Sequence, residues 1–391
     1  MNILVLCKKV PYPAIDGESI VIMKDLELLK TMGHTIHLAC LNTQKHFIDT
    51  QNYSEKKIFW SSFFDEKMNT SLNLKSILDL MMKKTPIHLV RFWDKTFLES
   101  LKLIVIQQEI DVILCQGLPM ICYADFLKKE FNCKILYRAH NIEHKIWQDL
   151  AGQTNSFLKK NAYNYISKSL AHYEKNSLAF CDSILTLNTI ENSFFKHIYS
   201  QIPCHEVAIS LGDARLDSKT FSNDKIKLLI TGSMDWKPNL EGISWFLEKV
   251  WPHISKEHFE LTIAGKGIEN WAKASKSLFD FKLIGKYESV THLFESHDLL
   301  LIPLFSGAGI RIKVIEAMQF GIPFIGTKIA LDGIHGIEEL EIETNVKIWI
   351  EKINSIFENH VNLNSISEKN KKIYNSNYSN EIIKQQWQNV F

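Results

Sequence analysis

Three things are scarce in this sequence: long apolar runs, an excess of one charge, and closely spaced cysteines. No stretch approaches the roughly 20 consecutive apolar residues that a membrane-spanning helix needs. The opening MNILVLCKKV reaches two lysines after only a few apolar residues, so we expect no signal-peptide core there. The 45 basic and 44 acidic residues nearly cancel, which gives no indication of nucleic acid as a partner.

The seven cysteines, at positions 7, 40, 115, 122, 133, 181 and 204, are odd in number and unclustered. None of them forms a CxxC pair, and they stand in apolar, strand-like surroundings. We therefore expect reduced core residues of a cytoplasmic protein. With 391 residues, of which 46% are hydrophobic, the chain is long enough for two domains.

Short β-rich apolar runs alternate with amphipathic helical patterns, which is typical of parallel sheets built from βαβ units. Strands are expected at 2–7, 34–41, 111–116, 134–139, 182–188 and 205–210. The small and polar residues of 211–225 then interrupt the alternation, which restarts with IKLLITG. The patterns thus predict two successive open α/β domains.

The expected fold is α/β, with two Rossmann-like parallel-sheet domains that face a central cleft. We expect an N-terminal domain over residues 1–211, a linker over 212–224, a second domain over 225–375 and a C-terminal helix over 376–391. The terminal helix is expected to pack back on the first domain. In open sheets of this kind, ligands bind beyond the carboxyl ends of the strands.

The most informative segment is PLFSGAGIRIKVIEAMQFGIPFIGT, residues 303–327. A helix is expected from about Arg311 to Phe320, with Gly321 as its stop. Small residues let backbone N–H groups approach an anion, and a helix N-terminus adds partial positive charge. Four small residues precede the expected helix: Ser306, Gly307, Ala308 and Gly309.

Arg311 and Lys313 place two full positive charges at the start of this helix, where cations are normally unfavourable. That placement makes sense if a phosphate group binds there. Glu316 lies on the same helix at i+3 from Lys313, so an ordinary surface Lys–Glu pair is the alternative. Two cations beside several small residues favour the phosphate interpretation.

The segment resembles the hallmark of group 1 glycosyltransferases, retaining enzymes of the GT-B type that use nucleotide sugars. It follows a subgroup pattern, G-x-G-x-R-x-K-x-x-E, with Gly307, Gly309, Arg311, Lys313 and Glu316. The resemblance implies that Glu316 binds the ribose of the donor and that the backbone from Ser306 to Gly309 contacts its sugar. Ala308 stands where the family often has a second glutamate.

TGSMDWKPNLEG, from residue 231, resembles the start of the second domain of these enzymes. Ser233 and Asn239 stand where many relatives carry an arginine and a lysine that clamp the diphosphate. The resemblance therefore implies that Arg311 and Lys313 neutralise the leaving diphosphate, with Lys237 as a weaker candidate. We expect no metal and no cofactor, because cations and N–H dipoles do that work.

VPYPAIDGES resembles the family's loop after the first strand, which puts Gly17 and Glu18 on the acceptor side; a plain βα turn is the alternative. KILYRAHN resembles the strand whose last histidine faces the donor sugar, so His140 is a candidate catalytic residue and Glu143 an acceptor-side residue. His140, Glu143 and His144 also spell H-x-x-E-H, a zinc pattern. The strand-like residues before His140 argue against zinc, which needs both histidines on one helix.

The expected function is transfer of a hexosyl group from a nucleotide-diphosphate sugar to an acceptor hydroxyl in cell-surface glycan or polysaccharide biosynthesis. The expected partners are the nucleotide sugar and a glycan or lipid-linked acceptor. A nucleotide-sugar 2-epimerase, a non-catalytic nucleotide-sugar-binding protein and a zinc peptidase are alternatives. Residues 81–102 mix basic and aromatic side chains, which suggests a peripheral contact with the inner face of the membrane; core aromatics beside solvated lysines would explain them equally well.

Overall fold

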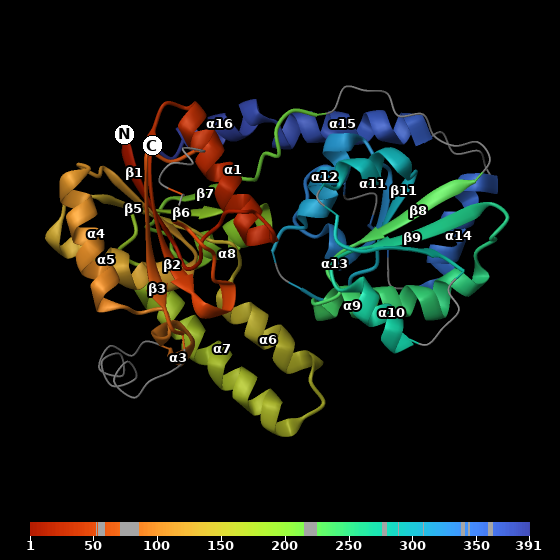
Figure 1. The fold of residues 1–391 in the computed structure, drawn as a ribbon, viewed down its shortest axis with the longest axis horizontal. Coiled ribbons are helices and arrows are strands. Elements are labelled where there is room, and N and C mark those ends of the chain that lie inside the picture. The colour runs from red at the N-terminus through yellow and green to blue at the C-terminus, as the bar shows by residue number, and fades with distance from the viewer. Residues whose placement is uncertain are drawn as a thin grey trace. The chain divides into compact units, whose positions relative to one another are not determined.

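Figure 1 shows the computed structural model of the chain. The structure describes residues 1–51, 53, 59–70, 86–214, 225–275, 280–287, 289–307, 309–337, 341–342, 345–358 and 363–391. These residues form two compact units: unit 1 comprises Met1–Ile209 and Ile383–Phe391, and unit 2 comprises Ser210–Ile382. Ala308, positions 215–224 of the expected linker and positions 81–85 of the suggested membrane segment lie outside the described residues.

Unit 1 contains, within the described residues, a seven-stranded parallel sheet in the order β3-β2-β1-β4-β5-β6-β7. Its central strands are mainly apolar because helices cover both faces, and every residue of β4 is buried. The strands are β1 (Asn2–Cys7), β2 (Thr35–Thr43), β3 (Ser62–Met68), β4 (Val112–Gln116), β5 (Lys134–Arg138), β6 (Ser183–Thr186) and β7 (Cys204–Glu206).

The helices of unit 1 connect these strands. They are α1 (Gly17–Thr31), α3 (Ile87–Val90), α4 (Lys95–Gln107), α5 (Ile121–Glu130), α6 (Glu143–Gln153), α7 (Phe157–Ser177) and α8 (Thr189–Ile198). Helix α16 (Asn380–Gln388) begins in unit 2, and its residues from Ile383 onward belong to unit 1. Helices α6 and α7 form an antiparallel hairpin that runs away from the sheet (Figure 1).

Unit 2 is also built on a parallel sheet. Within the described residues this sheet has six strands, in the order β10-β9-β8-β11-β12-β13. Its strands are β8 (Ile226–Thr231), β9 (Phe259–Ala264), β10 (Lys282–Ile284), β11 (Leu299–Ile302), β12 (Phe324–Thr327) and β13 (Glu341–Ile342). Its helices are α9 (Lys237–Trp245), α10 (Ile268–Ser275), α11 (Thr291–Ser296), α12 (Ile312–Phe320), α13 (Lys328–Leu331), α14 (Val346–Glu358) and α15 (Leu363–Tyr378).

Both sheets have the doubly wound order in which the third, second and first strands are followed by the fourth, fifth and sixth. The predicted fold class, an α/β protein with two Rossmann-like sheets, is confirmed. The winding reverses between β1 and β4 in unit 1 and between β8 and β11 in unit 2. The loops at the carboxyl ends of these strands are where such sheets bind ligands. No helix among the described residues is both long enough and apolar enough to span a bilayer.

Candidate functional site

The turn between β11 and α12 follows a strand at the reversal point of unit 2. Gly307 and Gly309 have φ angles of 120° and 79°, a region that residues with a side chain avoid. A Cβ on Gly307 would also lie 2.9 Å from Nη2 of Arg311 and 3.1 Å from the ring of Trp236. The small residues of the motif therefore meet a conformational and a steric requirement. Ser306 is buried, and its Oγ has no hydrogen-bond partner among the described residues.

Arg311 lies immediately before α12, in an extended conformation with φ −90° and ψ 91°. The expected helix from about Arg311 to Phe320 is confirmed to within one residue, and Arg311 is its N-cap residue. Nη1 donates a hydrogen bond to the carbonyl oxygen of Gly309 at 2.9 Å, and the guanidinium carbon is 5.9 Å from the ring centroid of Trp236. The guanidinium is thus held against the glycine turn.

Lys313 reaches from α12 to the loop that follows β8. Its Nζ donates to the carbonyl oxygen of Thr231 at 2.6 Å and to Oδ1 of Asn239 at 3.4 Å. The ammonium therefore lies at the loop of Ser233 and Asn239, where the resemblance led us to expect basic residues in many relatives. Burial and, second to it, the nearby charge of Arg311 lower the pKa of Lys313 to about 8, although the charge of Glu316 opposes the shift.

Glu316 lies one helical turn beyond Lys313. Burial raises the pKa of this carboxyl to about 7, although the charge of Lys313 opposes the rise. Burial, with the charge of Glu316 second, also raises the pKa of the Tyr287 phenol to about 12. Lys237, the weaker basic candidate, is exposed and forms an i,i+4 ion pair with Glu241 at 3.1 Å.

In unit 1, Gly17 begins α1 and Glu18 lies in its first turn. Lys8, which follows β1, approaches Oε1 of Glu18 to 3.1 Å, and Lys9 approaches Oε2 to 3.3 Å. Burial alone would raise the pKa of Glu18, but Lys8, His140 and Lys9 together hold it at about 2. The acceptor-side candidate Glu18 is therefore an ionised carboxylate in contact with two lysines.

His140 follows β5 and is buried. Its Nε2 is 2.8 Å from Oε1 of Gln116, the last residue of β4, and this carbonyl oxygen can only accept a hydrogen bond, so Nε2 is the donor. Burial lowers the pKa of His140 to about 4, so the imidazole is neutral at pH 7. Nδ1 then carries a lone pair, and it has no hydrogen-bond partner among the described residues.

Glu143 begins α6, and its backbone N–H donates to Oε1 of Glu174 at 3.4 Å. Burial raises the pKa of the Glu143 carboxyl. Nδ1 of His144 is 2.7 Å from the other oxygen of Glu174. His140 precedes α6 while His144 lies in it, so the two imidazoles do not share the single helix that the zinc pattern needs. Within the described ranges no three His, Cys, Asp or Glu side chains are grouped closely enough to hold a metal ion.

The sequence-based candidates therefore form one cluster in each unit. Gln116 and Glu174, which orient His140 and His144, were not among them. Gln116 could have been found, because it ends the strand expected at 111–116 and such positions face ligands. Glu174 lies 30 residues from His144 in the interior of α7, and no local pattern connects the two.

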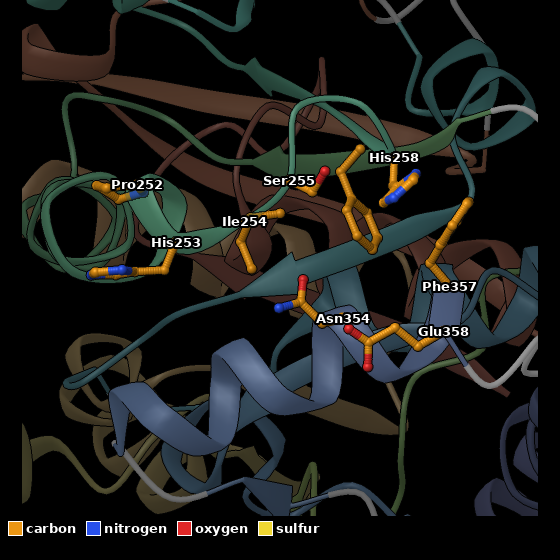
Figure 2. Close-up of a pocket in the computed structure, with 9 residues that line it drawn as sticks. Pro252, His253, Ile254, Ser255, His258, Asn354, Phe357 and Glu358 are labelled. Atoms are coloured by element: carbon orange, nitrogen blue, oxygen red, sulfur yellow. The ribbon is translucent and has the colours of Figure 1, made fainter.

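A hollow of about 450 Å³ in unit 2 lies away from these residues (Figure 2). It is bordered by Phe259, the first residue of β9, and by the end of α14, where the ring of Phe357 stacks on His258 with centroids 3.8 Å apart. The hollow is therefore at the amino ends of the strands, the edge opposite to the one where doubly wound sheets bind ligands. None of the candidate residues borders it.

Two doubly wound sheets, each with polar groups at its reversal point, define the architecture of a GT-B protein. Residues 225–359 match the model of the family "Glycosyl transferases group 1". The match lies within unit 2, and it is to the family that the motif at 303–327 resembles.

The solved structures agree with this fold. Sucrose-phosphate synthase from Thermosynechococcus elongatus is 14% identical, with a TM-score of 0.71 over 100% of this chain and 98% of that one. HepE from Anabaena, solved in complex with UDP, is 12% identical, with a TM-score of 0.67 over 100% and 99%. Among curated proteins, an uncharacterized 44.6 kDa protein in the cps region of Klebsiella pneumoniae is 26% identical over 90% of each chain.

Proposed function

We propose that this protein transfers a hexosyl group from a nucleotide-diphosphate sugar to an acceptor hydroxyl, with retention of anomeric configuration. The observation that carries the proposal is the pair of cations at the glycine turn of unit 2. The charge of Arg311 lowers the pKa of Lys313, and one carboxylate, Glu316, accompanies the two cations on α12. Like charges held together at low solvent exposure favour an anionic ligand.

The leaving diphosphate is the natural ligand for these two cations. Negative charge builds on its bridging oxygen as the bond to the anomeric carbon breaks. Arg311 and Lys313 then stabilise the transition state more than the ground state, which is the condition for catalysis. Nζ of Lys313 reaches Asn239, which stands where many relatives carry a lysine. In this proposal, two cations from the start of α12 bind the diphosphate in place of cations from the loop after β8. Such an arrangement requires no metal.

Glu316 is proposed to accept hydrogen bonds from the ribose hydroxyls of the donor. It lies on α12 one turn beyond Lys313, so the same helix would hold the diphosphate and the ribose. Ser306 and the backbone from Gly307 to Gly309 would then bind the sugar. The buried, unpartnered Oγ of Ser306 supports this role, because such a group is stabilised once a ligand hydroxyl pairs with it.

On the acceptor side, the lone pair on Nδ1 of His140 is proposed to accept a hydrogen bond from a sugar hydroxyl. Glu18 and Glu143 would bind hydroxyls of the acceptor. Glu18 interacts electrostatically with His140 and Lys8, and Glu143 interacts with Lys8. These interactions fit a single polar patch in unit 1. The imidazole is neutral at pH 7, and its Nε2 is held by Gln116. His140 is therefore better suited to orient a sugar hydroxyl than to transfer protons at that pH.

The relatives suggest the substrate class. HepE has been solved in complex with UDP-glucose, and the Klebsiella pneumoniae relative is encoded in a cps region. We therefore propose a UDP-sugar as donor, a glycan or lipid-linked glycan as acceptor, and a role in cell-surface polysaccharide biosynthesis. All seven cysteines lie in the described part of the chain and none is in a disulfide, which supports a cytoplasmic location.

Thermal unfolding in the presence of nucleotides tests the donor site. We expect UDP or a UDP-sugar to raise the melting temperature, with EDTA having no effect, because a ligand of the native state stabilises it by mass action. Glu316→Gln keeps the shape of the side chain but removes its charge, and should abolish most of the shift. Glu351→Gln, on the exposed surface of α14, is the matched control and should retain it.

Turnover then distinguishes the proposed reaction from the alternatives. Release of UDP that depends on an added acceptor supports a transferase. Release of free UDP with an altered sugar in the absence of acceptor would identify a 2-epimerase, and binding without turnover would identify a binding protein. A melting temperature unaffected by every nucleotide tested but lowered by EDTA would overturn the donor site.

A further inference from the structure

The hairpin of α6 and α7 ends in an apolar tip that no other described residue covers. Phe157 and Leu158, the first two residues of α7, are 75% and 80% exposed, and Tyr165, two turns further along, is 75% exposed. The loop that joins the helices is at the end of the hairpin remote from the sheet of unit 1 (Figure 1). Folding therefore leaves three large apolar or aromatic side chains in solvent.

The tip is exposed because the hairpin packs through its other face. The rings of Trp147 and Tyr163 meet with centroids 5.7 Å apart, and Oγ of Ser167 donates to the carbonyl oxygen of His144 at 2.9 Å. Leu158 and Tyr165 are seven residues apart, so they share one face of α7. Neither residue is among the buried positions of the helix, so this face contributes little to the packing of the hairpin.

The same tip carries a net positive charge. Residues 150–173 include no aspartate or glutamate but three lysines, all exposed: Lys159, Lys160 and Lys168. The segment therefore has a formal charge of +3, whereas the whole chain has +1. Lys159 and Lys160 directly follow the exposed pair Phe157 and Leu158, so apolar and basic groups occupy the same end of the hairpin.

We propose that this tip, residues 150–168, docks onto an anionic lipid surface, with Phe157 and Leu158 inserted between the headgroups. Aromatic and aliphatic side chains partition into the headgroup boundary, and neighbouring lysines keep their charge at the lipid phosphates. A stable protein partner typically covers roughly 800 Å² of each surface, whereas lysines beside two exposed apolar side chains match the anionic headgroups of a lipid surface. The surface is separate from residues 81–102, and the proposal does not depend on the reaction assigned to the protein.

Flotation of the full-length protein with lipid vesicles tests the proposal. We expect binding to vesicles of phosphatidylcholine and phosphatidylglycerol in equal parts, but not to phosphatidylcholine alone, and weaker binding at high salt. Replacing both apolar residues, by Phe157→Ser and Leu158→Ser, should lower the partition coefficient by about tenfold or more. Replacing both lysines, by Lys159→Gln and Lys160→Gln, should weaken binding and its salt dependence.

Leu103 and Ile106 on α4 provide the matched control, since they are 57% and 61% exposed in the same unit. Changing both to serine also removes two exposed apolar side chains but should leave flotation unchanged. Unchanged binding of the Phe157 and Leu158 variant, or no binding of the wild type to anionic vesicles, would overturn the proposal. It would also be overturned if that variant lost self-association in size-exclusion chromatography without any effect on flotation, because the tip would then bind a second copy of the chain.

Discussion

At the scale of single residues, Lys313 and Glu316 lead to a prediction about pH. Burial raises the pKa of Glu316 to about 7 and lowers that of Lys313 to about 8. A carboxylate accepts hydrogen bonds from both ribose hydroxyls only when it is ionised, and a lysine attracts diphosphate only when it is protonated. Nucleotide affinity should therefore rise as the pH increases through about 7 and fall again above about 8. Calorimetric titration of UDP across this range measures both limbs.

Single substitutions at Glu316 and Lys313 distinguish the rise in nucleotide affinity near about pH 7 from the fall above about pH 8. Glu316→Gln should remove the rise at low pH, and Lys313→Gln should remove the fall at high pH. Without ligand, the pH dependence of the free energy of unfolding has the opposite direction at Glu316. The folded state holds a proton on this carboxyl more tightly than the unfolded chain does. The stability this contributes is present at acid pH and is lost as the pH rises through about 7. A pH-independent affinity for wild-type protein would exclude the assigned roles.

Much of the candidate donor site could be predicted at this scale, because its residues are consecutive in the sequence. Glycines, two cations and one carboxylate within a single turn and helix form a pattern that is visible without a structure. Glu174 could not be found from the sequence, since it meets His144 only through the fold, and Gln116 could be found only from its place at the end of the strand expected at 111–116. The shifted pKa values were also out of reach, because they arise from burial, which depends on how the elements pack.

At the scale of elements, the start of α1 shows how a helix end can hold the loop that follows β1. Oδ1 of Asp16 accepts a hydrogen bond from the backbone N–H of Ser19 at 3.0 Å, and Oδ2 accepts one from Lys9 at 2.6 Å. We expect Asp16→Ala to cost about 1 kcal/mol for the lost cap and up to about 1 kcal/mol for the half-exposed ion pair. Urea denaturation measures the sum as a lower unfolding midpoint.

Asp16→Asn is the matched variant, because asparagine caps a helix as well as aspartate does but cannot pair with Lys9. This variant should lose only the contribution of the ion pair to the free energy of unfolding and should keep that of the cap. Although burial opposes the shift, Lys9 and the N–H of Ser19 lower the pKa of Asp16, so this stabilisation should disappear as the pH falls through the carboxyl range. Equal costs for both variants would show that the cap contributes nothing.

The buried strands could be predicted because both faces of a central parallel strand are apolar. The runs expected at 111–116 and 134–139 became β4 and β5. Strand β3 was not expected: it lies at the sheet edge, is mostly half-buried, and its sequence SFFDEKM lacks a continuous apolar run. The strand expected at 205–210 spans Cys204–Glu206 instead. Edge strands pair along one side only, so their sequences are less constrained.

At the scale of the whole molecule, the chain passes from unit 1 to unit 2 after Ile209 and returns before Ile383. The returning segment completes the core of unit 1. Trp387 is fully buried, with the guanidinium carbon of Arg138 5.8 Å from its ring centroid, and Oε1 of Gln386 accepts a hydrogen bond from the backbone N–H of Ala208 at 2.9 Å. The stability of unit 1 therefore depends on residues that follow unit 2 in the sequence.

Trp387→Ala should destabilise unit 1 by about 3–5 kcal/mol, the usual cost of removing a large buried aromatic side chain. Limited proteolysis during heating, with fragments mapped by mass spectrometry, should show earlier cleavage within residues 1–209. The UDP-dependent stabilisation of unit 2 should persist, since the proposed donor site contains no residue of the returning segment. Gln388→Ala, at an exposed position of the same helix, is the matched control and should behave like wild type. If the two variants unfolded alike, the returning segment would not be part of the core of unit 1.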